Sequence, residues 1–194
     1  MKRVVLIVSV ILVMMVGFNS CGGYNNLVAL DEGVAQSWAN VETQYQRRAD
    51  LIPNLVNTVK GYASHEKETL ESVINARAKA TSININPNEL TSESMAAYQQ
   101  AQGDVSSALG RLMVVAERYP DLKANQNFTE LQAQLEGTEN RIAVARENFN
   151  RTTREYNTIV RRFPTNIMAS MFNFESKPYF ESTATAAEAP VVQF

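Results

Sequence analysis

Apolar or small side chains recur along residues 128–163 at spacings that alternate between three and four. The positions are Phe128, Leu131, Leu135, Thr138, Ile142, Ala145, Phe149, Thr152, Tyr156, Ile159 and Phe163. This heptad pattern predicts one long helix that presents a continuous seam to partner helices. Asn127 is a suitable N-cap, and Pro164 ends the pattern. At 1.5 Å per residue the helix would be about 55 Å long.

A second apolar stripe predicts a helix over residues 92–119. Its members are Met95, Tyr98, Gln102, Val105, Leu109, Leu112, Ala116 and Tyr119. Ser92 is a suitable cap, and Pro120 follows the end. Gly103 and Gly110 share one face, and each costs about 1 kcal/mol relative to alanine in a helix. We therefore expect another helix to approach closely there.

The remaining helical pattern covers residues 26–81 and contains Pro53 in its middle. The stripe keeps its phase through the proline, which favours the alternative of three long helices with the first kinked at Pro53. An unbroken helix of this length would measure about 84 Å, twice its neighbour. Because proline removes a helix hydrogen bond, we expect a break near residues 50–53. The sequence then predicts an all-α, antiparallel four-helix bundle-like domain.

The connections and ends are also marked in the sequence. Residues 82–91 and 119–126 carry asparagine and proline, which predicts connectors. A brief helix is expected within residues 167–174. Residues 182–194, rich in alanine and threonine, are expected to be a flexible C-terminal tail.

The amino end is expected to reach a membrane. Lys2 and Arg3 precede an apolar run from Val4 to Phe18, interrupted only by Ser9. Such a helix spans about 22 Å, whereas a membrane core measures about 30 Å. A positive start, a short apolar run and a small residue before Cys21 are typical of a secretory signal.

Two interpretations of this segment stay open. It is similar to a bacterial lipoprotein signal with Cys21 as the lipidated residue, although Phe18 stands where leucine is usual. It also fits an uncleaved signal anchor. Either way the positive end remains in the cytoplasm, so the domain lies on the extracytoplasmic side of a bacterial envelope. We assign residues 1–20 to the signal or membrane segment and residues 21–181 to the helical domain.

The amino-acid composition makes several classes of function unexpected. Lys+Arg number 18 and Asp+Glu 20, so a basic nucleic-acid-binding surface is not expected. One histidine and one cysteine leave little for a metal site, a disulfide framework or a nucleophile paired with a histidine. His65 has Thr69, not a second histidine, four residues later. We expect no cofactor, no metal and no enzymatic activity.

The segment Arg47-Arg48-Ala49-Asp50, followed by Pro53-Asn54, is the candidate site. Two arginines beside an aspartate could form ion pairs that pin a helix corner. They could instead present guanidinium groups to an anionic partner or a lipid head group. The run Glu139-Asn140-Arg141, beside the seam residue Thr138, is expected to fix the register of neighbouring helices through polar contacts.

The sequence resembles the LemA family over residues 24–181. The resemblance is carried by residues 24–27, 38–42, 44–56, 58–62, 76–78, 117–124 and 136–142, and then by Arg146, Tyr156-Asn157, Phe163-Pro164 and Tyr179-Phe180. The segment Gln44-Tyr45-Gln46-Arg47-Arg48-Ala49-Asp50-Leu51-Ile52-Pro53-Asn54 is its most specific part. One departure is Asn173, where a glycine is expected before Phe174.

This resemblance implies a membrane-anchored, four-helix bundle-like domain with no settled biochemical activity, and it supplies no catalytic residues. We therefore expect a scaffold that binds protein partners not yet known and is attached to a membrane. The alternative is a binder of lipid head groups or of a small anionic ligand near the membrane. A third possibility is an enzyme with an unrecognised carboxylate or Ser–Lys site.

Overall fold

The computed structural model is an all-α, elongated helical bundle. It describes the backbone of residues 2–181 and the side chains of residues 22–181 except residue 88. The long helices are α1 (Lys2–Tyr62), α2 (Lys67–Ser82), α3 (Ser92–Ala116) and α5 (Gln126–Arg161), and the short ones are η1 (Pro87–Glu89), α4 (Pro120–Lys123) and α6 (Thr165–Met171). These bounds confirm the predicted fold class and the brief helix after Pro164.

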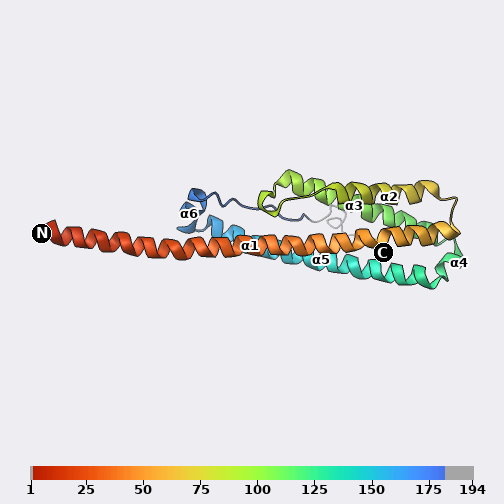
Figure 1. Cartoon of the computed structure of the whole chain (residues 1–194), viewed down its shortest axis with the longest axis horizontal. Helices are drawn as coiled ribbons and strands as arrows, with labels where there is room; N and C mark the ends of the chain where they lie inside the picture. Colours follow the sequence, from red (N-terminus) through yellow and green to blue (C-terminus); the bar gives the residue numbers. More distant parts are fainter. Residues whose placement is uncertain (1, 182–194) are drawn as a thin grey trace, which may run out of the picture.

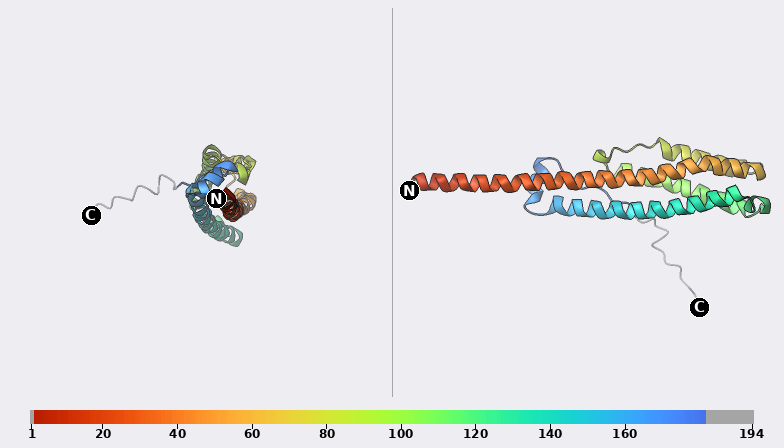
Figure 2. Two further views of the ribbon diagram at one scale, coloured as in Figure 1. Left: turned by 90° about the vertical axis from the view of Figure 1, so that its left-hand side faces the viewer. Right: turned by 60° about the horizontal axis from the view of Figure 1, so that its bottom comes forward.

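The long helices run alternately up and down, and α1 sets the length of the molecule (Figure 1). α1 packs mainly along α5, α2 packs along α3, and α1 also contacts α2. The N-terminal stretch of α1 extends beyond one end of the bundle, and α4 lies at the other end (Figure 1). Figure 2 shows from two other sides that α5 lies alongside α1.

The predicted break near residues 50–53 is wrong, because α1 continues through Pro53 to Tyr62. The chain turns instead at residues 63–66, before α2. Proline has no N–H, so the carbonyl of Ala49, four residues earlier, loses its helical donor. Nε of Arg77 on α2 donates to that carbonyl at 2.7 Å. A side chain from the next helix thus replaces the hydrogen bond that Pro53 removes.

A double-mutant cycle tests whether the Arg77 side chain replaces the backbone N–H that Pro53 lacks. Arg77→Ala should cost about 1–2 kcal/mol of unfolding free energy, because the Ala49 carbonyl loses its donor. In a Pro53→Ala background the new N–H of residue 53 supplies the bond, so Arg77→Ala should cost less. Denaturant unfolding of the detergent-solubilised full chain measures both costs. Equal costs in the two backgrounds would show that Arg77 stabilises the bundle by other contacts.

The seam of α5 is buried as predicted in its first half and shifts by one position in its second. Thr153 and Val160 are buried in place of Thr152 and Ile159, and Phe163 lies beyond the helix end with 76% of its surface exposed. A straight helix has 3.6 residues per turn, so a strict heptad drifts off the contact line after several turns. The N-cap is Asn125 rather than Asn127, and it accepts from the N–H of Phe128 at 3.1 Å.

α3 differs from its prediction in three details, the first being that it ends at Ala116 and not at residue 119. Its cap is Thr91 rather than Ser92, and Thr91 and Ser94 form a reciprocal capping box. Gly103 and Gly110 face open space, so the expected close helix approach is wrong. The two glycines lie on the exposed side of α3, away from its buried stripe.

One of the two clusters of the hydrophobic core, the one that includes Ala169 of α6, is built around the fully buried Trp38. Its indole packs against the rings of Tyr98, Phe149 and Phe180, with ring centroids 5.2–5.8 Å away. Phe180 belongs to an extended segment, residues 175–181, that we call the C-terminal strap. The strap brings an aromatic side chain back into this core, to which the connector residues Ile85 and Leu90 also contribute.

Two asparagines of α5 hold the C-terminal strap in place. The side chain of Asn150 donates to the carbonyl of Phe180 and accepts from its N–H, at 2.9 and 2.8 Å. Asn157 makes the same pair of bonds with Lys177, both at 2.8 Å. Each amide therefore satisfies the backbone of the strap as a neighbouring β-strand would.

Asn173, the departure from the expected glycine, ends α6. Its φ of 58° lies in the left-handed region, where glycine is favoured and asparagine is the next best tolerated residue. The N–H of Phe174 donates to the carbonyl of Ala169 at 2.9 Å, which is the longer bond of a Schellman cap. The backbone geometry thus explains why a glycine is expected at this position.

Several predictions concern residues outside this description. The side chains of residues 1–21, Cys21 included, and the predicted tail 182–194 are not part of it. Within the described residues, no helix has a stretch both long enough and apolar enough to cross a membrane.

Candidate functional site

The two arginines of the candidate site lie in opposite environments. Arg48 is 2% exposed, whereas Arg47 points to solvent. Asp50 is also exposed and accepts a hydrogen bond from Gln46 at 2.7 Å, so it does not pair with Arg48. Pro53 and Asn54 lie on the exposed side of α1. The sequence segment is therefore not a single site.

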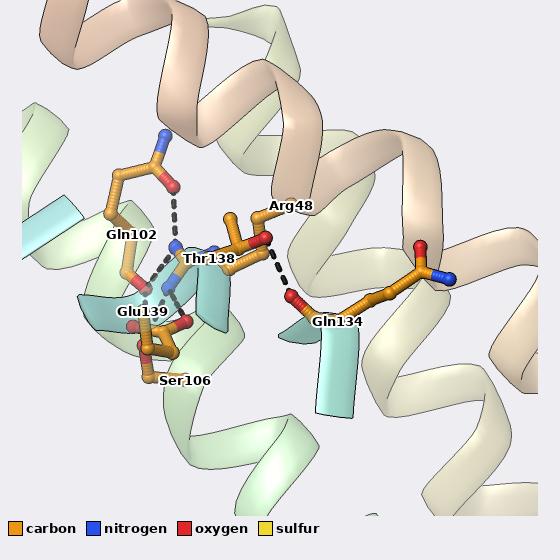
Figure 3. A network of polar contacts seen from close by, with 6 residues as sticks. All are labelled: Arg48, Gln102, Ser106, Gln134, Thr138 and Glu139. Carbon is orange, nitrogen blue, oxygen red and sulfur yellow. Dashed lines mark hydrogen bonds and ion pairs between the residues drawn. The ribbon is translucent and has the colours of Figure 1, made fainter. Parts of the chain in front are cut away.

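The guanidinium group of Arg48 joins α1, α3 and α5 (Figure 3). Nη1 donates to Oε1 of Glu139 at 2.7 Å and to Oγ of Ser106 at 2.8 Å. Nη2 donates to the backbone oxygen of Gln102 at 3.0 Å and to its Oε1 at 2.6 Å. Arg48 also lies over the ring of Tyr45, 5.1 Å from the centroid. The four N–H groups of Nη1 and Nη2 are thus all engaged within the protein.

The chemistry of arginine explains why this position suits it. Its planar fork can donate to several acceptors in fixed directions at once, which a lysine cannot do. A buried charge is tolerated only when it is paired and hydrogen-bonded, and Arg48 has both a carboxylate and three neutral acceptors. The predicted corner held by ion pairs within the segment is therefore wrong: Arg48 pairs with Glu139 on α5 and not with Asp50, and α1 has no corner there.

Glu139 confirms the predicted polar contact between helices, while its neighbours Asn140 and Arg141 are exposed. Gln102 and Ser106 were not predicted as site residues. Gln102 carried a signal, since it is a polar side chain on the apolar stripe of α3. A polar residue at such a position indicates a buried partner.

A cleft of about 800 Å³ lies beside Arg48, between α1, α2 and α3. Arg47, Arg77 and Tyr98 are among its lining residues. Burial raises the pKa of the Glu42 carboxyl at its edge, and the nearby indole N–H of Trp38 offsets part of that shift. Burial also raises the pKa of Tyr98 and Tyr45, so both phenols stay neutral.

Other titratable groups of the described residues take part in contacts within the bundle. No group of three or more metal-ligating side chains comes together among the described residues. Glu66, beside the only histidine, pairs with Arg118 at 2.9 Å and accepts from the hydroxyl of Tyr119 at 3.1 Å. Lys79 and Gln100 hold the pKa of the exposed Asp104 carboxyl below its usual value. These groups stabilise the contacts between helices.

Comparison with known proteins gives the same family as the sequence resemblance. A family model described as "LemA family" matches residues 37–194. Magnetosome protein MamQ of Magnetospirillum gryphiswaldense is 28% identical over 190 residues, covering 87% of this chain and 68% of the relative. Magnetosome protein MamQ 2 of Paramagnetospirillum magneticum is 27% identical, with the same coverage. Protein LemA of Metamycoplasma hominis is 23% identical over 165 residues, covering 84% of this chain and 70% of the relative.

Proposed function

Because the chain belongs to the LemA family, we propose that it is a membrane-anchored helical scaffold that binds protein partners and catalyses no reaction. Its N-terminal segment holds it in the membrane, and the bundle stands on the extracytoplasmic side of a bacterial envelope. The names of its relatives state no reaction. The apolar run after Lys2 and Arg3 supports both the anchoring and the orientation.

The observation that carries the proposal is the continuity of α1. One helix runs from Lys2 through the apolar run and the whole bundle to Tyr62. An α-helix is stiff, so whatever holds its first turns also fixes the direction of the bundle. The bundle therefore extends away from the membrane along α1, and its outer faces are accessible to partners.

The engagement of Arg48 argues against a ligand site at that residue. Its donors already serve acceptors on α3 and α5. Arg47 is exposed and forms no ion pair within the described residues, but it lies 29 residues beyond Phe18, or about 44 Å along α1. Lipid head groups are out of its reach while α1 stands across the membrane. For this reason we favour protein partners over lipid head groups for this part of the bundle.

The outer faces of the bundle suit contacts with proteins. Single large apolar side chains emerge from otherwise polar surfaces at Ile74 on α2, Val114 on α3 and Val144 on α5. Around Val144 a shallow cleft is lined by amides of α1 and α5, including Gln44, whose buried Oε1 has no hydrogen-bond partner among the described residues. A partner that donates a hydrogen bond there would satisfy this acceptor.

Site-specific photo-crosslinking in intact cells tests the proposal. A photoreactive amino acid is placed at Val144, Val114 or Ile74 of the full chain, one position at a time. Because these positions lie on different helices, each serves as the control for the others. We expect one position to give a discrete protein adduct that the other two do not give.

Two outcomes would contradict the scaffold function. One is the absence of any adduct at all three positions while the chain is folded and membrane-bound. The other is saturable turnover of a small substrate that is lost when a single carboxylate is changed.

A further inference from the structure

Exposed apolar side chains gather at the end of the bundle from which α1 protrudes. They are Phe163, Ile167, Met171, Phe172 and Tyr179, together with Tyr24 of α1. We call this set the α6 patch. Large apolar groups side by side on a protein surface mark a contact with another apolar phase.

Within the patch, α6 shows the reverse of the pattern expected for a soluble bundle. Its small residue Ala169 faces the bundle and is 1% exposed. Ile167 and Met171, one turn apart, face away and are 57% and 70% exposed. A helix of a soluble protein normally turns its apolar side toward the core. The outward side of α6 is therefore built for a partner outside the bundle.

The patch is held against α1 where that helix leaves the bundle. The ring of Tyr24 meets the ring of Phe172 with centroids 4.9 Å apart. Gly23 lies against Met168 so closely that a Cβ would come within 3.3 Å of its Cε. These contacts fix the α6 patch at the height of residues 23–24 along α1.

That height coincides with the expected boundary of the membrane. The hydrocarbon core is about 30 Å thick, which corresponds to about 20 residues of helix. Counted from Val4, this length ends at Tyr24. If instead Cys21 is lipidated, Tyr24 lies only about 4.5 Å further along the helix. Both open interpretations of the N-terminal segment bring the α6 patch to the interface.

Two basic residues next to the patch suit the same surroundings. Arg161 and Arg162 come directly before Phe163, and both are exposed. In the described part of the chain neither forms an ion pair. Guanidinium groups bind phosphate well, and anionic lipids attract such basic residues near the surface. The tyrosines of the patch have the amphipathic rings typical of membrane interfaces.

We propose that the α6 patch inserts into the head-group region of the bilayer that holds the N-terminal segment. The inference rests on the membrane anchoring proposed above and adds a second contact with the lipid. The stiff helix α1 sets the direction of the bundle, but a single helix can itself tilt in the bilayer, and a patch beside it restricts that tilt. The ligand of this surface is thus the bilayer itself.

Tryptophan quenching by brominated lipids tests this contact. The full chain with Met171→Trp is reconstituted into vesicles of phosphatidylethanolamine and phosphatidylglycerol whose acyl chains are brominated near the head group. The native Trp38 is buried and about 21 Å beyond Tyr24 along α1, so it contributes a constant background. Val114→Trp is the matched control, because Val114 is 69% exposed and lies toward the opposite end. We expect loss of emission for Met171→Trp and no loss for the control.

Flotation of the same vesicles separates the two proposals. A chain that does not float with the vesicles overturns the anchoring itself. The α6 contact alone is overturned if the chain floats with the vesicles but the bromines quench neither variant. The two variants are Met171→Trp and Ile167→Trp. A blue-shifted emission without bromine quenching also overturns it, because the patch is then covered by protein rather than lipid.

Discussion

Trp38→Ala should lower the free energy of unfolding by about 3–5 kcal/mol. The indole is fully buried and contacts three aromatic rings from three different segments. Its removal leaves a cavity that the helices cannot close without moving the C-terminal strap, since Phe180 stacks on Trp38. Denaturant unfolding of the detergent-solubilised full chain, followed by circular dichroism, measures this loss.

The matched control is Val114→Ala, a truncation on the exposed side of α3. Because this side chain is 69% exposed, the change should be within about 0.5 kcal/mol of zero. A cost below about 1 kcal/mol for Trp38→Ala would contradict the packing described for this core. So would native tryptophan emission that is red-shifted and freely quenched by a water-soluble quencher.

Arg48→Gln should destabilise the bundle by about 3 kcal/mol, because buried acceptors of Gln102 lose their donor and the ion pair with Glu139 is lost. Glu139 is 44% exposed and can be solvated by water, which keeps the loss moderate. The expected result is a lower unfolding midpoint with the denaturant slope unchanged.

Arg47→Gln, one residue away, is the control for this variant. Its side chain points to solvent, and it should change stability by less than about 0.5 kcal/mol. Comparing the two variants separates the buried structural arginine from the exposed one, which the sequence alone does not distinguish. If both variants are as stable as the wild type, the network around Arg48 does not hold the helices together.

The helical class and most helix boundaries could be predicted because they follow from local properties. The stripe of α5, the stop before Pro164 and the start of α3 near residue 92 depend on neighbours within one or two turns. The prediction for the second half of α5 was displaced by one residue because it assumed an exact heptad repeat. A strict heptad assigned Thr152 and Ile159 to the seam, and the actual helix buries Thr153 and Val160.

The candidate site was only partly predictable for the same physical reason. The sequence drew attention to Arg47-Arg48-Ala49-Asp50, but not to which arginine is buried. Which arginine is buried depends on which face of α1 packs against α3 and α5. The partner Glu139 is 91 residues from Arg48 along the chain. No local pattern encodes such a distance, although the polar Gln102 on an apolar stripe was a usable signal.

The sequence by itself determined the all-α class, the family, and the succession of long helices with a short one after Pro164. These features arise from hydrophobic periodicity and from residues that start or stop helices. Only the tertiary structure decided that α1 continues through Pro53, because the donor for the Ala49 carbonyl comes from Arg77 on another helix. It also decided which side of α6 is left exposed, since burial depends on what packs against a helix, and one of the partners of α6, the helix α1, lies far away along the chain.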